Sequence, residues 1–458
     1  PTTAPVKPAP RPTPQLTETQ TADSPFSTFS LHVGDASFQL ARASLAKNEW
    51  PEAGRIRIEE FVNAFDYGDP VPSGEEKVSA QIEQAAHPFL QQRNLLRLSM
   101  RTATAGRGAG TPLRLTFLLD NSGSMEREDR RETVRRAFAI LAGLMQPEDR
   151  VTLISFARQP RLLADKIAGD QTGNLVERIR NLPSEGGTNL ESALQLAFEK
   201  AKEQQLDTAQ NRIVLLTDGA ANLGDANPES LARRIETMRE AGIAFDAAGV
   251  GTEGLNDEIL EALTRKGDGR YYLLAAPEDA DAGFAEKIAG AFRPAAKNVK
   301  VQVEFNPKRV PRYQLLGFDK HRLKKEDFRN DKVDAAELAA EEAGVAVYHF
   351  EADPQGSGDV GFVSVRFRDM STGRMVERKW TIPYQRDAKA LIDASPSLKL
   401  ASASALFAAK LEGGPLGDVV EMEELTTILG GLPGAWQNRE KVAALRSMLD
   451  TARELEGK

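Results

Sequence analysis

The sequence predicts an α/β protein in which a doubly wound, mostly parallel sheet is inserted in a composite antiparallel β domain and followed by a C-terminal helical segment. Three observations support this. Between residues 112 and 296, short apolar runs alternate with segments of helical periodicity, the pattern of repeated βα units. On both sides of this region, apolar and polar residues alternate singly, as in strands with one buried face. Beyond residue 387 the apolar residues return to helical spacing.

The central region is expected to hold five strands that are buried on both faces. They correspond to residues 113–119, 151–156, 213–216, 243–250 and 271–274. Amphipathic helices fall between them, and one of these carries Val134, Phe138 and Leu141 on a single face. Only residues 157–160 separate the second strand from the segment near 161–164, whereas a parallel crossover needs a dozen or more residues. We therefore expect that segment to be an antiparallel edge strand.

The two flanking regions, 25–111 and 297–386, are expected to form one β-rich frame. Apolar residues occupy every second position around Val301 and again around Leu98. Because the few strands on each side are not enough for two independent stable sheets, we expect the flanks to pair with one another.

The two ends of the chain differ from this pattern. Six of the first fourteen residues are proline, so residues 1–24 are predicted to be a disordered, extended tether. Residues 387–458 are predicted to be helical. The chain then divides into the tether, the N-terminal flank, the βα domain at 112–296, the C-terminal flank and the helical region.

Composition excludes several classes of function. The 458 residues carry 59 basic and 67 acidic side chains, a net charge of −8, so no chain-wide positive field favours nucleic acid. No window approaches the roughly 20 apolar residues of a transmembrane helix. The absence of cysteine excludes disulfides, thiolate nucleophiles and cysteine metal sites. The four histidines are scattered in the sequence, so any bound metal is expected to have oxygen ligands.

Oxygen-bearing side chains gather where the predicted strands end. Asp120, Ser122 and Ser124 follow the first strand, and Thr188 precedes a helix. Asp218 follows the strand at 213–216, which is the fourth when the edge strand is counted. In the common doubly wound order these two strands are neighbours at the switch point, where ligands bind beyond the carboxyl ends. We therefore expect both aspartates to face one crevice, with the threonine overhanging it.

Three hydroxyls and two carboxylates are hard donors that suit Mg²⁺, Mn²⁺ or Ca²⁺. If the hydroxyls bind directly and the aspartates act mainly through water, the cation stays underneutralised and one ligand short of an octahedron. The carboxylate of a partner could fill that position.

At these residues the sequence resembles the von Willebrand factor type A domain, and the match is to its metal-ion-dependent adhesion site. All three motif segments, Asp120/Ser122/Ser124, Thr188 and Asp218, stand in the family's order. The resemblance implies that the hydroxyls contact the cation, that the aspartates orient it largely through water, and that an Asp or Glu of a partner protein completes its coordination. It implies adhesion, not catalysis.

The flanks are similar to those of a bacterial group that carries a von Willebrand domain between characteristic flanking regions. The similarity lies in residues 27–37, 57–67, 301–307 and 313–318. Gly34 stands where that group commonly has an aspartate, so no ligand role is assigned to the N-terminal block. Many members look exported or lipid-anchored, which implies an extracytoplasmic location and, as an expectation, a lipid tether upstream of Pro1.

Other interpretations remain open. The protein could be a structural component of the cell envelope in which the inserted domain only stiffens the frame. It could also be an accessory subunit of an ATPase, and that ATPase would be a separate protein because this sequence has no ATPase motif. Residues 249–254 match a dinucleotide fingerprint, but they lie near the last βα turn, and a tight turn explains the glycines. Asp120 could instead be a nucleophile that accepts a phosphoryl group. The residue two positions on is Ser122, however, so a second aspartate that could act as the acid is missing.

Overall fold

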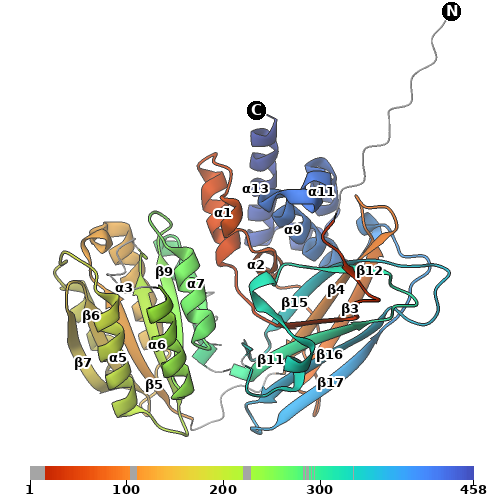
Figure 1. The fold of residues 1–458 in the computed structure, drawn as a ribbon. Coiled ribbons are helices and arrows are strands. Elements are labelled where there is room, and N and C mark those ends of the chain that lie inside the picture. Colours follow the sequence, from red (N-terminus) through yellow and green to blue (C-terminus); the bar gives the residue numbers. More distant parts are fainter. Residues whose placement is uncertain are drawn as a thin grey trace, which may run out of the picture.

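The computed structural model describes residues 16–103, 111–219, 228–281, 284, 288–289, 291–292, 294–333 and 335–457. Figure 1 shows an α/β domain beside a β-rich frame, with a group of helices packed over the frame. This is the arrangement that the sequence predicts.

The α/β domain is built on a six-stranded sheet in the order β10-β9-β8-β5-β6-β7. Its strands are β5 (Leu113–Asp120), β6 (Arg150–Phe156), β7 (Pro160–Ala168), β8 (Gln210–Thr217), β9 (Ala244–Val250) and β10 (Tyr271–Leu274). All neighbours are parallel except β7, which runs antiparallel to β6 at the edge. The predicted edge strand and the predicted pairing of the first and fourth strands, β5 and β8, are both confirmed.

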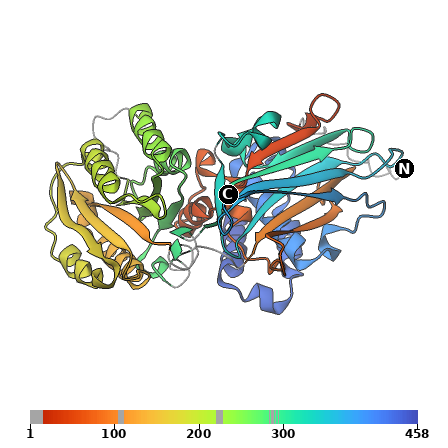
Figure 2. The same cartoon turned by 90° about the horizontal axis from the view of Figure 1, so that it is seen from below.

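Helices cover both faces of this sheet (Figure 2). They are α3 (Glu128–Gly143), α4 (Gly173–Arg180), α5 (Leu190–Gln204), α6 (Pro228–Glu240) and α7 (Asp257–Lys266). Alternate residues along β5 point to opposite layers: Phe117 packs in one core with Phe138 of α3, and Leu118 packs in the other with Leu194 of α5. Burial on both faces explains why the strands read as continuous apolar runs.

The frame contains two antiparallel sheets, each composed of strands from both sides of the α/β domain. One has the order β1-β12-β15-β4-β3 and the other β13-β2-β11-β16-β17, with β14 added beside β11. β2 pairs with β11 and β4 with β15, which confirms the predicted composite domain. The strands are β1 (Thr19–Gln20), β2 (Phe26–Ser30), β3 (Val78–Ala86), β4 (Arg93–Thr102), β11 (Pro294–Phe305), β12 (Arg312–Leu316), β13 (Arg322–Leu323), β14 (Ala336–Ala339), β15 (Ala343–Glu351), β16 (Gly361–Asp369) and β17 (Met375–Ile382).

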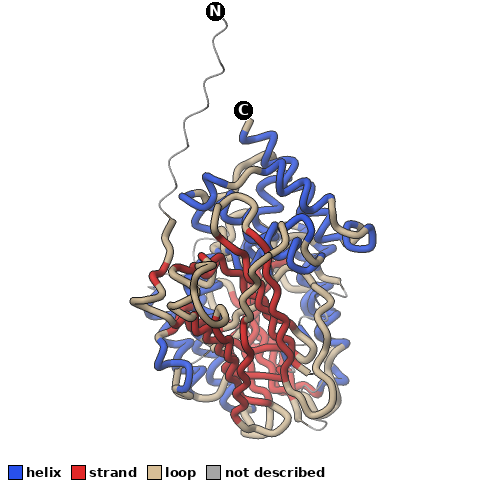
Figure 3. The backbone as a smooth tube through the Cα atoms, turned by 90° about the vertical axis from the view of Figure 1, so that its right-hand side faces the viewer, coloured by secondary structure: helices blue, strands red, loops and turns tan. Residues whose placement is uncertain are grey.

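The two frame sheets share one apolar core. Phe29 and Val301 of one sheet pack with Leu96, Leu98 and Tyr348 of the other. Figure 3 shows these strands together, with the helices above them. The single alternation in the sequence follows from this sandwich, because each sheet buries only one of its faces here.

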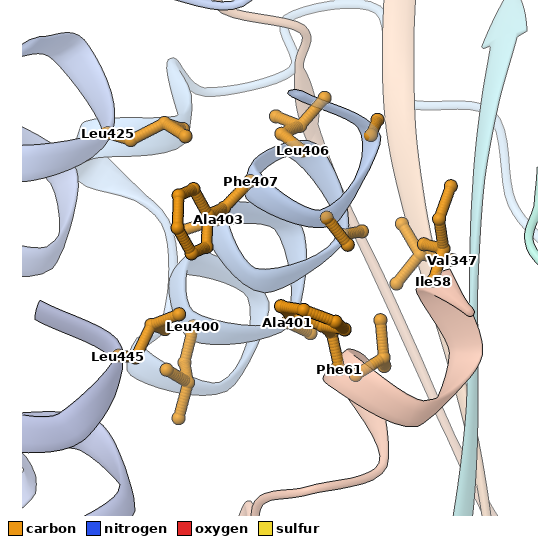
Figure 4. Close-up of a cluster of buried hydrophobic side chains, with 14 of the residues drawn as sticks. Ile58, Phe61, Val347, Leu400, Ala401, Ala403, Leu406, Phe407, Leu425 and Leu445 are labelled. Carbon is orange, nitrogen blue, oxygen red and sulfur yellow. The ribbon is translucent and has the colours of Figure 1, made fainter. Parts of the chain in front are cut away.

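A further group of helices forms a fourth core against the frame. They are α1 (Ala36–Ala46), α2 (Ile58–Val62), α9 (Pro396–Glu412), α10 (Gly414–Val419), α11 (Met422–Gly430), α12 (Gly434–Gln437) and α13 (Glu440–Glu456). Figure 4 shows α9 at the centre of this core, where Phe407 and Leu400 lie among Phe61 of α2, Leu445 of α13 and Val347 of β15. The C-terminal helices and the N-terminal flank therefore fold as one unit.

The N-terminal stretch differs in part from the expectation of a tether over 1–24. Residues 1–15 lie outside the described residues, but Thr19–Gln20 pair with β12. The reason is a buried charge: Glu18 accepts two hydrogen bonds from Arg93, at 2.7 and 2.9 Å. Proline content marks the first fourteen residues and gives no signal for this contact.

Within the described ranges, no helix combines the length and apolar character needed to cross a bilayer.

Candidate metal site

The ends of β5 and β8 meet at one edge of the α/β sheet. Asp120 is the last residue of β5, and Asp218 directly follows β8. The hydroxyl of Thr217 at the end of β8 donates a hydrogen bond of 2.6 Å to Oδ2 of Asp120. The structure thus brings the two predicted aspartates to the same edge of the sheet, because parallel neighbours end at the same edge.

The serines that follow β5 lie in a short turn that directs both hydroxyls to one place. The backbone N–H of Ser122 donates to Oδ1 of Asp120 at 2.9 Å, which closes the turn. The hydroxyl oxygens of Ser122 and Ser124 are then 3.1 Å apart. Two oxygens at this separation are neighbours in the way that adjacent ligands of one small cation are.

Thr188 lies, half-buried, in the loop that leads into α5. This loop crosses the ends of β5 and β6: Glu185 N–H donates to Asn121 O at 3.1 Å, and Asn189 N–H donates to Ala157 O at 2.7 Å. The Asn189 side chain caps α5 by accepting from Ser192 N–H at 3.0 Å. The loop is therefore held on the sheet edge that carries Asp120.

The two aspartates are buried and interact electrostatically. Asp120 is 3% exposed and Asp218 is fully buried. Burial raises the pKa of Asp120, the hydrogen bonds from Thr217 and Ser122 oppose this, and the negative charge of Asp218 raises it further. Two buried carboxylates need a nearby positive charge.

Arg130 of α3 supplies one such charge, and our sequence analysis did not identify it. One terminal nitrogen of its guanidinium forms an ion pair with Oδ2 of Asp218 and donates to Ser124 O at 2.9 Å. The other donates to Glu253 O at 2.6 Å. A usable signal existed, because Arg130 precedes Val134 by four residues on the apolar face of the helix.

The loop between β9 and α7 closes the rear of the site. Gly219 has φ of +60°, and a Cβ there would lie 2.9 Å from Asn256 N, so only glycine fits against the loop. Gly251 and Gly254 also have positive φ, of +75° each. The glycines at 249–254 thus serve a tight turn.

The same loop joins the site to the frame. Arg57 donates to both oxygens of Asp257, at 2.7 and 3.1 Å, and to Glu60 at 2.8 Å. All three side chains are buried. Asp257 begins α7 and directly follows Asn256, whose N–H donates to Gly219 O. One short loop therefore contacts the frame through Asp257 and the candidate site through Asn256.

The residues present fit a hard divalent cation. Two converging hydroxyls and two buried carboxylates form a set of oxygen donors that suits Mg²⁺ or Ca²⁺. In the part of the chain that the structure describes, no group of three or more histidine, aspartate and glutamate side chains is arranged to hold a metal. The four histidines, scattered in the sequence, form two pairs: His32 stacks on His321 with ring centres 4.5 Å apart, and His87 lies 5.9 Å from His349.

Three family models match different parts of the chain. Residues 115–220 match the von Willebrand factor type A domain, residues 13–97 match a model described as von Willebrand factor, and residues 290–445 match the C-terminal region of the uncharacterized protein YfbK.

Individual relatives extend this similarity. YfbK of Escherichia coli is 30% identical over 333 residues, which cover 70% of this chain and 57% of YfbK. The uncharacterized protein sll0103 of Synechocystis is 26% identical over 231 residues, 50% of this chain and 53% of that protein. The chain thus spans a little over half the length of these relatives.

Among solved structures, a von Willebrand factor type A protein from Catenulispora acidiphila aligns with a TM-score of 0.49 and 16% identity, covering 83% of this chain and 89% of that one. The strand order and the match at residues 115–220 show an α/β fold like that of the von Willebrand factor type A domain, set between flanks of which the C-terminal one is similar to YfbK.

Proposed function

We propose that this protein is a non-enzymatic interaction module that binds a partner protein through a divalent cation. Ser122, Ser124 and Thr188 would contact the ion, Mg²⁺ or else Mn²⁺ or Ca²⁺, while Asp120 and Asp218 orient it. When bound, the ion supplies a Lewis-acidic position that accepts a carboxylate oxygen from an Asp or Glu of the partner. The observation that carries the proposal is the convergence of two hydroxyls and two buried carboxylates at the ends of β5 and β8.

The chain's own residues prepare this position. Thr217 and the backbone of Ser122 hold both oxygens of Asp120, which fixes the carboxylate before any ion binds. Because the ligands in direct contact with the ion are neutral hydroxyls, the ion keeps its affinity for an anionic ligand. This division favours capture of an anionic ligand over very tight retention of the metal.

A calorimetric titration with Mg²⁺ tests the site. Asp120→Ala removes one buried carboxylate, so we expect Mg²⁺ affinity to fall at least about tenfold, equivalent to roughly 1.4 kcal/mol. Asp129→Ala is the matched control: Asp129 is exposed on α3, pairs with Arg127, and is expected to leave Mg²⁺ binding unchanged. Equal Mg²⁺ affinity in the parent protein and in a folded Asp120→Ala variant would refute the site.

Adding a chelator to a pull-down separates this function from that of a structural envelope component. A metal-dependent adhesin should lose its partner without unfolding. A protein in which the domain only stiffens the frame should instead show a large fall in melting temperature. Recovery of an ATPase in the same pull-down would favour the accessory-subunit role.

We also propose that the protein acts outside the cytoplasm of a bacterium. The proposal rests on the resemblance of both flanks to an exported bacterial group. Cell fractionation of the native organism checks it, and recovery in the cytoplasmic fraction would contradict it.

A further inference from the structure

The candidate site includes a positive charge, the guanidinium of Arg130, that is not among the five predicted site residues. A divalent ion and the carboxylates of Asp120 and Asp218 sum to zero, since the hydroxyl ligands are neutral. A partner carboxylate would then approach a site without net charge. The guanidinium of Arg130, paired with Asp218 inside the protein, makes the total +1.

This guanidinium is fixed in place. Its two terminal nitrogens donate to Asp218, Ser124 O and Glu253 O, and the side chain is buried. A Cβ on Gly251 would lie 3.3 Å from Nε of Arg130, so the turn at Gly251 leaves just enough room for it. Arginine stays protonated at any physiological pH, so the charge is permanent.

The guanidinium and the metal compete for the same carboxylate. Asp218 already has a cationic partner before an ion binds, and two cations close together repel each other. In a buried site this repulsion is poorly screened by salt. Arg130 therefore opposes metal binding, while the same positive charge attracts a ligand carboxylate.

We propose that Arg130 is a positioning residue that weakens metal binding and strengthens capture of the partner's carboxylate. The inference rests on the proposed function and assigns a regulator of that same site. At an effective dielectric constant of about 20 to 40, two unit charges about 5 Å apart change each other's binding affinity by roughly twentyfold to three-hundredfold, and the effect on a divalent ion is larger. The two effects have opposite signs, which a purely structural role would not produce.

The test measures Mn²⁺ affinity by electron paramagnetic resonance of the free ion, in chloride and in acetate at equal ionic strength. Arg130→Met removes the charge, so we expect Mn²⁺ to bind at least about tenfold more tightly. Acetate should increase Mn²⁺ affinity in the parent protein, and this increase should shrink in the variant. Thermal stability of the variant should also depend more strongly on Mn²⁺, because Asp218 is left without its guanidinium.

Matched variants keep the experiment decisive. Arg131→Met removes the same charge one residue on, from an exposed side chain that donates to Leu182 O. It is expected to leave both affinities within about twofold of the parent. Arg130→Lys keeps the charge and should behave like the parent. Arg130→Gln can still donate to Asp218 and serves as the neutral variant if Arg130→Met does not fold.

The outcomes distinguish this inference from the proposed function. If the parent protein does not bind Mn²⁺, the proposed function fails. If the parent binds Mn²⁺ but a folded neutral variant binds it no more tightly, or if acetate acts equally on both, the role of Arg130 is overturned and the metal site stands.

Discussion

Glu59 of α2 is a buried carboxyl at the contact between α2 and the turn that follows β12. Its Oε2 accepts a hydrogen bond of 2.8 Å from Phe318 N–H. A Cβ on Gly317, which has φ of +79°, would lie 2.5 Å from that oxygen. His321 lies close by, with Nε2 3.9 Å from Oε1 of Glu59. Burial raises the pKa of Glu59 to about 7, and the neighbouring Glu60 adds to the shift while Phe318 N–H and Arg57 oppose it.

This shift predicts a specific dependence of stability on pH. The folded protein holds the Glu59 proton up to about pH 7, whereas a glutamate in the unfolded chain releases it near 4.5. The contribution is therefore complete below pH 4.5 and is lost as the pH rises to 7, a change of about 3 kcal/mol in the free energy of unfolding. Burial also lowers the pKa of His321, which disfavours protonation of the histidine beside Glu59.

Glu59→Gln should remove this dependence. The amide oxygen can still accept from Phe318 N–H, so the variant should gain stability relative to the parent between pH 4.5 and 7. Urea unfolding at several pH values measures the difference. Glu76→Gln, at an exposed position, is the control and should follow the parent. Parallel pH profiles for the parent and Glu59→Gln would contradict the prediction.

Site residues were predictable where their position at the end of a strand places them at a known edge of the sheet. Asp120 and Asp218 each end a buried parallel strand, and strand order alone places them at one edge. Arg130 was not predicted, because a basic residue in a helix is normally solvated and its burial depends on a carboxylate 88 residues away. The two histidine pairs were not predicted either, because the members of each pair come from distant parts of the chain.

At the scale of elements, α9 is buried on almost every side. Its buried residues include Leu400, Ala403, Leu406 and Phe407, and apolar residues of α2, α11, α13 and β15 lie in the same core (Figure 4). A helix that is apolar all round needs neighbours on all sides. The N-terminal and C-terminal parts of the frame supply them together.

Leu406→Ala should therefore be costly. Leu406 is fully buried, and truncating such a side chain costs about 2–5 kcal/mol of the free energy of unfolding. Urea unfolding followed by circular dichroism measures this. Leu162→Ala on the edge strand β7, where the leucine is 41% exposed, should cost less than about 0.5 kcal/mol. Similar losses in the two variants would show that α9 does not organise this core.

The types of the elements were more predictable than their extents. Single alternation identified the frame strands, and continuous apolar runs identified the parallel ones, because each pattern reflects which faces are buried. The edge strand β7 reaches Ala168 although its exposed residues show little pattern. The strand β1 was not predicted, because a strand of two residues is too short to show a periodic pattern.

At the scale of the whole molecule, the two connections to the α/β domain begin side by side. Thr102, at the end of β4, donates to Ala339 O at 2.5 Å. Pro294, at the start of β11, pairs with the same Ala339. The frame is therefore closed at the point where the α/β domain is inserted.

This arrangement predicts that the frame folds without the inserted domain. Replacing residues 104–293 with a short Gly-Ser linker should leave a chain with β-rich circular dichroism and cooperative unfolding, because the joined ends already lie together. It should be less stable than the parent, since Arg57 loses Asp257. In contrast, a chain that begins at residue 111 lacks β2, β3 and β4 and should not fold its frame. A linker-joined frame without cooperative unfolding would contradict the prediction.

The pairing of β2 with β11 also constrains how the protein is made. A ribosome adding about 5–20 residues per second needs at least about ten seconds to pass from β4 to β11. During that interval the α/β domain can complete its own sheet, while β2 and β4 wait for β11 and β15, which are not yet synthesised. The nascent N-terminal strands must be shielded until then, so we expect this protein to depend on chaperones more than its size alone would suggest.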